Sequence, residues 1–374
     1  MKIAWVAQSL ASCWNHGNAH FLRGVVRALG ARGHTVTAWE PEDCWSRDNL
    51  VQDHGPGALE AFEQQFADLL RAVHRGAVDA ERIADGAELV VVHEWNEPAL
   101  VAALGRLRAA GGRFTLLFHD THHRAVSDPA QMRAFELDAF DGVLAFGASL
   151  AEIYARRGWG DRAFVWHEAA DVSVFAPPEE ESAREGLVWI GNWGDGERTA
   201  ELDRFLFRPA QAAGLPLDVF GVRYPTEALD GLRARGARYH GWIANADVPR
   251  TFARHMATVH VPRRFYVDRL KGIPTIRVFE ALACGIPLLS APWPDEEGLF
   301  RPGADFLVAR DEDEMIRLIR LVRDDPDVGR ALAAYGHRTI LKRHTCAHRV
   351  DELLAIVEKL RAADPGKRRH ARVA

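Results

Sequence analysis

Short apolar runs alternate with longer amphipathic segments along most of the chain. The runs KIAWVA, ELVVVHEW and RFTLLFHD have the length and composition of buried strands, and segments such as NAHFLRGVVRALGARG repeat apolar residues at helical spacing. Strands that alternate with helices are typical of βαβ units, in which helices cover both faces of a parallel sheet. The pattern therefore predicts an α/β fold.

The alternation stops once and then starts again. Residues 176–186 (APPEEESAREG) are rich in Pro, Glu and Ser and form the best candidate for a linker. On either side we expect two similar, doubly wound, Rossmann-like domains over residues 1–175 and 186–335, facing a cleft where open α/β sheets bind ligands. A charged amphipathic stretch predicts a C-terminal helix at 336–363, and the basic residues 364–374 read as a disordered, solvated tail.

Composition narrows the function classes. The chain has 374 residues, is 48% hydrophobic and 26% charged, and its net charge of −5 gives no electrostatic case for nucleic acid or an anionic membrane. The four cysteines show no CxxC pair, which argues against a disulfide framework or a zinc site. No run approaches ~18 apolar residues and the N-terminus reads as a strand, so we expect a cytoplasmic protein without a membrane span.

Polar side chains follow the predicted strand in LLFHDTHHR. It delivers His119, Asp120, His122 and His123 within five residues. Imidazole and carboxylate suit zinc or iron, but the adjacent histidines point in different directions and no further ligand pair is evident, so we expect no metal. A loop in which one histidine serves substrate or proton transfer is favoured over surface histidines without a role. We take His119 and Asp120 as candidate catalytic residues.

The turn after the first strand, SLASCWNHGNAHF, places Gly17 and Asn18 directly before a helix. Free backbone N–H groups at a helix start bind phosphate or carboxylate. The GxGxxG pattern of dinucleotide sites is absent. A plain turn, in which the glycine supplies a positive φ, is the alternative.

A similar strand–helix junction occurs in the second domain, in WIGNWGDGERTAEL. Arg198 is placed in the first turn of the predicted helix, where a cation opposes the helix dipole. An arginine placed against that preference favours an anionic ligand. The alternative is an exposed arginine paired with Glu201.

Cations also crowd the loop in VPRRFYVDRLKGIPT. Arg263, Arg264 and Lys271 precede a helix for which Thr275 is a plausible N-cap. Cations beside a helix N-terminus make a credible diphosphate site.

Two charges, Arg277 and Glu280, lie three residues apart on that helix, IRVFEALACG, among small and apolar residues. A carboxylate accepts two hydroxyl hydrogen bonds, which suits a ribose diol. An internal ion pair between the two residues, worth a few tenths of a kcal/mol, explains the pattern equally well. The physics of the sequence leaves both interpretations open.

The segments that carry these residues resemble the CgeB-like branch of the glycosyltransferases, within the glycosyl transferases group 1 superfamily. The matching pieces are HGNAHFLRGVVRALGARGH, IGNWGDGERTAEL, PTIRVFEALACGIPLLSA, LFRPGADFLVARDEDEM and GHRTILKRHTCAHRVDELL, so the likeness spans nearly the whole chain. It implies a bacterial enzyme of the two-domain GT-B fold, with an acceptor-side first domain, a donor-side second domain and a C-terminal helix that crosses back onto the first.

The resemblance also implies an activity. The enzyme would move a hexose from a nucleotide diphosphate sugar to an unidentified glycan, lipid-linked or protein acceptor. It would need no cofactor or metal, and the broader family implies retention of the anomeric configuration.

Single positions take roles from the same resemblance. It implies that Glu280 binds the donor ribose, that the loop from Lys271 to Thr275 contacts the diphosphate and sugar, and that Arg198 binds phosphate. It further places His119 beside the reacting sugar and Gly17 near the donor phosphates.

One position departs from the family pattern. The wider family carries a glutamate that holds the donor sugar eight residues before the position of Glu280, and here that position is Gly272. The donor hexose would then be held by Arg263 or Arg277, or the donor carries a different sugar, or activity is lost. Gly272 also favours an alternative, a catalytically silent nucleotide-sugar-binding or assembly protein. A nucleotide-sugar epimerase is a further alternative, for which Asp120 and Glu94 are the available carboxylates.

Overall fold

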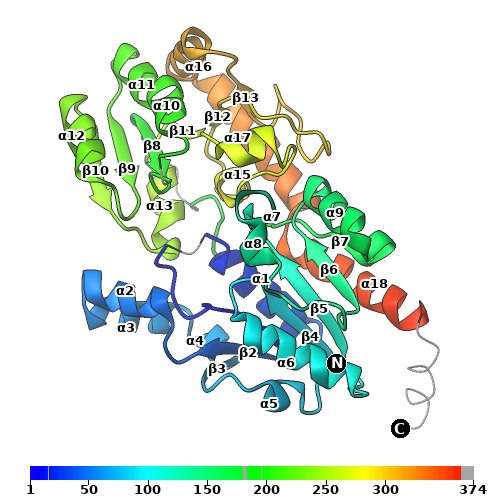
Figure 1. Cartoon of the computed structure of the whole chain (residues 1–374). Helices are drawn as coiled ribbons and strands as arrows, with labels where there is room; N and C mark the ends of the chain where they lie inside the picture. The colour runs from blue at the N-terminus through cyan, green and yellow to red at the C-terminus, as the bar shows by residue number, and fades with distance from the viewer. Residues whose placement is uncertain (16, 180–182, 195, 364–374) are drawn as a thin grey trace. The chain divides into compact units, whose positions relative to one another are not determined.

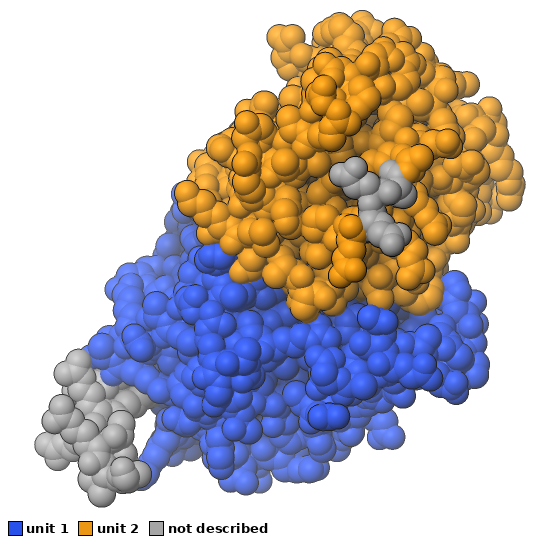
Figure 2. Space-filling view, turned by 180° about the vertical axis from the view of Figure 1, so that it is seen from behind, with its two compact units in different colours: residues 1–168, 346–374 blue, residues 169–345 orange. Residues whose placement is uncertain are grey.

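A computed structural model describes residues 1–15, 17–179, 183–194 and 196–363 (Figure 1). The chain forms two compact units, residues 1–168 together with the last helix, α18 (Cys346–Ala363), and residues 169–345 (Figure 2). Each unit contains one fully parallel sheet covered by helices, so the predicted α/β class with two Rossmann-like halves is confirmed. Residues 180–182 of the candidate linker lie outside the described residues, and so does the whole predicted tail, residues 364–374.

The first unit is built on a seven-stranded sheet of order β3-β2-β1-β4-β5-β6-β7. Its strands are β1 (Lys2–Val6), β2 (Thr35–Pro41), β3 (Val73–Gly76), β4 (Leu89–His93), β5 (Thr115–Asp120), β6 (Gly142–Ala145) and β7 (Ala163–Val165). The connecting helices are α1 (Ala19–Ala31), α2 (Trp45–His54), α3 (Pro56–Gln65), α4 (Ala67–Leu70), α5 (Ala80–Ala84), α6 (Pro98–Ala109), α7 (Arg124–Ser127), α8 (Pro129–Met132) and α9 (Ala148–Tyr154), which a π-helical turn, Ala155–Trp159, extends. The central strands β4 and β5 are buried along their whole length, as expected for a sheet covered on both faces.

Alternation along β5 assigns its side chains to the two faces of this sheet. Phe118 packs against Phe135 and Phe140 on one face. His119 points to the other face, where Phe21 of α1 contacts it. The side chains of β5 therefore belong to two separate halves of the core.

The second unit has a six-stranded sheet of order β10-β9-β8-β11-β12-β13. Its strands are β8 (Leu187–Ile190), β9 (Leu217–Phe220), β10 (Arg238–Gly241), β11 (Ala257–His260), β12 (Leu288–Ser290) and β13 (Leu307–Val308). Its helices are α10 (Thr199–Leu202), α11 (Arg208–Ala212), α12 (Thr226–Ala234), α13 (Val248–Ala253), α14 (Arg264–Asp268), α15 (Ile276–Ala283), α16 (Glu312–Asp324) and α17 (Pro326–Arg343). A large core cluster joins β8, β9, β11 and β12 to the helices α11 and α16.

The C-terminal helical stretch is interrupted. We expected one helix over 336–363, but α17 ends at Arg343 and α18 begins at Cys346. The backbone between the two helices pairs with another segment: the His344 carbonyl accepts a hydrogen bond from the Ala170 N–H (3.0 Å), and Thr345 forms a parallel β-bridge with Ala170. Within the first unit α18 packs against α1.

The part of the chain that the structure describes contains no disulfide bond and no cluster of side chains arranged as a metal site. All four cysteines are buried, and none of them forms a disulfide bond within the described residues. Among the described residues no group of three or more His, Cys, Asp or Glu side chains is placed to hold a metal ion. None of the helices described combines the length and apolarity that crossing a bilayer requires.

Candidate functional site

The carboxyl edge of the second sheet brings two of the predicted loops together. Strand β8 lies between β9 and β11. From β8 the chain runs to β9 and β10 on one side, and it then crosses to β11 on the other side, so the strand order reverses at β8. The loops that follow β8 and β11 flank this switch point, where open α/β sheets bind ligands. The first loop leads to Arg198 and the second to Arg263.

Arg198 connects the two loops. Its Nη1 donates a hydrogen bond to the Val261 carbonyl (3.1 Å) and its Nη2 to the Asn192 carbonyl (2.5 Å). The guanidinium lies over the Trp189 ring, 5.2 Å from its centroid. Arg198 occupies the N-cap position of α10, one residue before the helix and not inside its first turn as predicted. The alternative partner, Glu201, binds Arg264 instead (2.9 Å).

The charge of Arg198 is not matched by a carboxylate. The residue is only 9% exposed, and among the described residues no carboxylate forms an ion pair with it. Its Nε has no hydrogen-bond partner among those residues. Burial, and then the neighbouring Arg263, lower the pKa of Arg198 to about 10, so it stays charged at neutral pH. A buried cation held only by carbonyl groups is prepared to bind an anion.

Glycine at position 194 keeps the space beside Arg198 open. Gly194 has φ +79°, and a Cβ there would lie 3.2 Å from Arg198 Nε. A larger residue would be strained and would crowd the one guanidinium nitrogen that has no partner among the described residues.

Two further cations lie within electrostatic range of Arg198, since both Arg263 and Arg277 lower its pKa. Each has a carboxylate partner, Glu197 for Arg263 and Glu280 for Arg277. The structure therefore brings together three of the predicted donor-binding residues. An anionic ligand here would meet three guanidinium groups and compete with two carboxylates.

The structure shows Glu280 in the ion pair with Arg277, one of the two interpretations that the sequence left open. Its side chain is fully buried and forms an ion pair with Arg277, which is 31% exposed. Because the Glu280 side chain is fully buried, a ribose can reach it only if neighbouring side chains move. Its role in binding stays a prediction.

The loop before α15 contains Lys271 and Thr275. Lys271 is exposed, and Thr275 occupies the predicted N-cap position, although its side chain makes no capping hydrogen bond. Between them, Gly272 has φ +88°, and a Cβ there would lie 3.3 Å from the Glu296 Cβ. The backbone conformation at this position therefore disfavours a glutamate, and the sequence has glycine there.

Replacing Gly272 by alanine or glutamate is expected to lower the free energy of unfolding by about 1–2 kcal/mol, because an L-residue is strained in this conformation. Urea unfolding measures the change. Gly30→Ala is the matched control: Gly30 lies inside α1 with open space around it, and there alanine should stabilise by up to about 1 kcal/mol. A Gly272→Glu protein as stable as wild type would contradict the backbone argument.

His260 was not predicted as a site residue, although it ends β11 at the switch point. The Ser290 hydroxyl donates to the Ala291 carbonyl (2.8 Å), so His260 Nδ1–H donates to Ser290 Oγ (3.0 Å) and the proton is on Nδ1. Burial, and then Arg198, lower the pKa of His260 to about 3. The imidazole is therefore neutral and presents Nε2 as an acceptor. A polar residue at the end of a switch-point strand is the signal that could have identified it.

His119, the predicted catalytic histidine, lies in the core of the first unit. Its side chain is fully buried, with the Trp166 and His93 rings 4.9 and 5.1 Å away, and burial lowers its pKa to about 3. Neither ring nitrogen has a hydrogen-bond partner among the described residues. The expected contact with a reacting sugar is at odds with this geometry, because an enclosed imidazole offers no face to a ligand.

Asp120 is also fully buried. Its carboxyl group accepts hydrogen bonds from Tyr154 Oη (2.7 Å) and the His122 backbone N–H (3.1 Å). Burial, and then the charge of Glu94, raise the pKa of Asp120 well above its usual value, which favours the neutral acid. This placement indicates a structural group and argues against the predicted catalytic role.

Glu94 is also buried and is held by hydrogen bonds within the first unit. It accepts hydrogen bonds from the Thr121 backbone N–H (2.9 Å) and from Arg124 Nη2 (2.5 Å), and its side chain is fully buried. The two carboxylates that an epimerase would need, Glu94 and Asp120, are thus enclosed and held by other groups.

Gly17 and Asn18 lie in the loop between β1 and α1, and both are partly exposed. The Asn18 side-chain amide donates to Thr121 Oγ1, so this loop is tied to the one after β5. A further anchor is Glu40, which the sequence did not single out: its carboxylate accepts from the backbone N–H groups of Leu10 (2.6 Å) and Ala11 (2.8 Å). The position of Gly17 allows the predicted approach to phosphate but does not test it.

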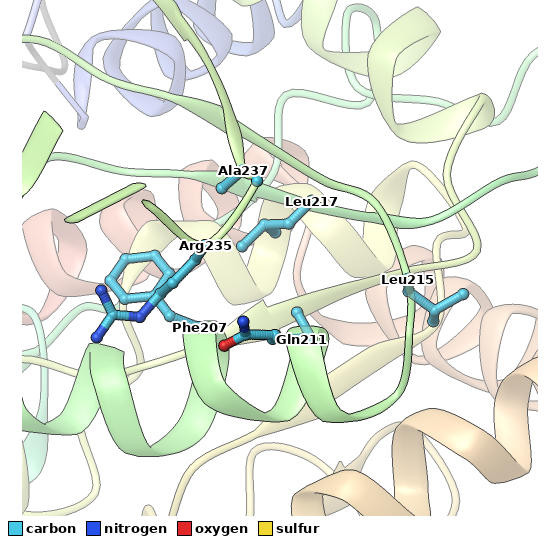
Figure 3. A pocket seen from close by; sticks show the side chains of 8 residues that line it. Phe207, Gln211, Leu215, Leu217, Arg235 and Ala237 are labelled. Carbon is cyan, nitrogen blue, oxygen red and sulfur yellow. The ribbon is translucent and has the colours of Figure 1, made fainter. Parts of the chain in front are cut away.

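The second unit also has a small cavity away from these loops. It has a volume of about 20 Å³, room for roughly one water molecule. Figure 3 shows the side chains around it, with Phe207 and Gln211 on one helical segment and Arg235 beside them. A space of this size does not hold a nucleotide.

A family model described as glycosyl transferase-like matches residues 198–355. The matched segment contains Arg198, Arg263, Arg277 and Glu280. None of the curated proteins matches the chain.

Solved structures with the same fold cover nearly the whole chain. Sucrose-phosphate synthase (tll1590) from Thermosynechococcus elongatus is 15% identical, with a TM-score of 0.62 over 97% of this chain and 100% of that one. Anabaena Alr3699/HepE in complex with UDP-glucose is 13% identical, with a TM-score of 0.64 over 95% and 99%. T4 phage BGT in complex with UDP-glucose is 12% identical, with a TM-score of 0.59 over 97% and 99%. These likenesses show the predicted GT-B fold.

Proposed function

We propose that this protein is a glycosyltransferase that moves a hexose from a nucleotide diphosphate sugar to an acceptor. The observation that carries the proposal is Arg198, a buried cation without a carboxylate partner among the described residues, at the switch point of the second sheet. The glycosyl transferase-like match over 198–355 and the UDP-glucose complexes of proteins with this fold support it.

The chemistry needs a stabilised leaving group. The bond between C1 of the hexose and the diphosphate oxygen breaks, and the diphosphate leaves with the electron pair. The acceptor oxygen forms the new bond to C1, and its proton passes to the departing diphosphate. Arg198, Arg263 and Lys271, with the N-terminus of α15, would balance the charge that develops on the diphosphate.

The finer features of the proposal rest on the resemblance to the CgeB-like branch. They are a hexose donor, independence from metal ions, retention of configuration and action in a bacterial cytoplasm. With Gly272 in place of the family's glutamate, Arg263 or Arg277 would hold the sugar.

A silent nucleotide-sugar-binding protein is the second candidate. It is favoured by the positive φ of Gly272 and by the ion pair that occupies Glu280. Binding of a sugar nucleotide without release of nucleoside diphosphate, in the presence of acceptors, would distinguish it from the enzyme.

A thermal-shift screen with UDP, GDP, dTDP and ADP tests the proposal. Ligand at 100 times its dissociation constant adds about 2.7 kcal/mol of stability. Arg198→Ala should weaken binding of the active nucleotide roughly tenfold to a hundredfold, because a hydrogen bond to a charged group is lost. The shift of the wild type should persist after dialysis against EDTA.

Arg235→Gln is the matched control. Arg235 is a half-buried arginine of the same unit that pairs with Asp203 (2.7 Å) beside the small cavity. Its replacement should leave the nucleotide shift unchanged. A folded wild-type protein that shifts with none of the four nucleotides would refute the proposed function.

A further inference from the structure

Trp95 is an exposed aromatic residue at the carboxyl edge of the first sheet. It lies in the loop after β4, and 39% of its surface is exposed. In the order β2-β1-β4-β5 the chain leaves β1 toward β2, and β4 lies on the other side of β1, so this loop flanks the switch point of the first unit. Large exposed aromatic side chains at such positions are candidates for ligand contact.

The backbone around Trp95 is held on both sides. Asn96 is buried, and its side-chain amide donates to the carbonyls of Val6 (3.0 Å) and His93 (2.7 Å). Glu94 is buried, and its backbone N–H donates to the His119 carbonyl (2.9 Å). Trp95 is therefore an exposed residue between two anchored ones.

The indole ring is also held. The Arg124 guanidinium lies 4.1 Å from its centroid and is itself fixed by Glu94 and by Gln131 (3.1 Å). The His122 ring meets the indole at 68°, with centroids 5.2 Å apart. A ring oriented in advance loses little conformational entropy when a ligand stacks on it.

The chemistry of this surface suits a sugar. A pyranose ring has a face of C–H groups that stacks on the electron-rich face of an aromatic ring, and hydroxyl groups around its rim. Polar groups that can meet the hydroxyl rim lie beside Trp95 in His122 and Arg124. A flat aromatic ligand would favour a slot between parallel rings, but among the described residues His122 is the one ring that contacts Trp95, and it does so edge-on.

We propose that Trp95 is a stacking platform for a hexose ring of the acceptor, so that the acceptor is a saccharide. This inference rests on the proposed glycosyltransferase function and adds the substrate class of its second substrate.

Saturation-transfer NMR with the methyl α- and β-glycosides of glucose, galactose and mannose, at saturating UDP, tests the platform. At least one glycoside should receive saturation at its ring C–H protons. Its affinity should fall at least tenfold in Trp95→Ala and less in Trp95→Phe, which keeps an aromatic face. The effect is read as the ratio of glycoside affinity to UDP affinity on the same sample, so that a folding defect is recognised.

Trp159→Ala is the matched control. Trp159 also stacks with an arginine, Arg162 at 4.8 Å, but it lies before β7, at the amino edge of the sheet. Its loss should not change glycoside binding. Any of three results would overturn the saccharide proposal. Wild type and Trp95→Ala could bind the glycosides equally well, wild type could bind none of them, or phenol could bind at Trp95 in place of the glycosides. A UDP shift would survive these outcomes, whereas loss of all nucleotide binding refutes the proposed function itself.

Discussion

Replacing Arg124 by alanine is expected to lower the free energy of unfolding by about 3–5 kcal/mol, because it leaves the buried Glu94 carboxylate without its partner. Arg124 donates to the Glu94 carboxylate through two nitrogens, at 2.5 and 3.1 Å, and to the Glu94 carbonyl at 2.8 Å. Burial already raises the pKa of Glu94 against the opposing effect of Arg124. Chemical denaturation of the purified variant measures the loss.

Two further variants identify the source of this loss. The double variant Glu94→Gln/Arg124→Met removes both charges and should be more stable than Arg124→Ala. Arg156→Ala breaks an exposed pair with Glu152 and should change stability by a few tenths of a kcal/mol at most. If the Arg124→Ala protein is as stable as the Arg156→Ala protein, the ion pair between Arg124 and Glu94 does not contribute the expected stability.

The second large effect is a change in acid sensitivity when His119 is replaced by phenylalanine. His119 titrates near 6.5 in the unfolded chain, and burial lowers its pKa to about 3 in the folded protein. Between these values the unfolded chain binds more protons, so stability is lost as the pH falls. Between pH 7.5 and pH 5 this histidine should cost about 2 kcal/mol, and His119→Phe should abolish that loss.

The exposed His54 provides the control for this experiment. His54→Gln should keep the acid sensitivity of the wild type, since His54 lies on the surface of α2. Unfolding curves at pH 7.5 and pH 5 for the three proteins give the comparison. If His119→Phe keeps the wild-type dependence on pH and also loses sugar transfer, His119 is accessible and its predicted role beside the substrate is restored.

The fold could be predicted because buried parallel strands leave a strong pattern. Strands such as β4 and β5 contain continuous apolar runs and are buried along their length, and apolar residues in the helices between them repeat at a different period. The break between α17 and α18 could not be predicted, because His344 and Thr345 contact Ala170, which is far away in the sequence. Only tertiary contacts interrupt an otherwise helical pattern there.

The sequence predicted the site residues whose positions follow from the order of the strands. It did not predict those whose role depends on the direction in which the side chain points. Arg198 and Arg263 meet because both follow switch-point strands, which the order of elements implies. His119 and Asp120 also end a strand, but their side chains turn into the core. The choice between a ligand and Arg277 as the partner of Glu280 was open in the sequence, and the structure shows Arg277.

Hydrogen exchange measured by mass spectrometry, with and without each of UDP, GDP, dTDP and ADP, tests the central claim most directly. The account predicts that one of these nucleotides protects the loops after β8 and β11, which lead to Arg198 and include Arg263, together with the start of α15. Arg198→Ala should weaken this protection, and Arg235→Gln should not. Protection confined to other parts of the chain, or none in a folded protein at saturating UDP, GDP, dTDP and ADP in turn, would contradict a donor site at this switch point.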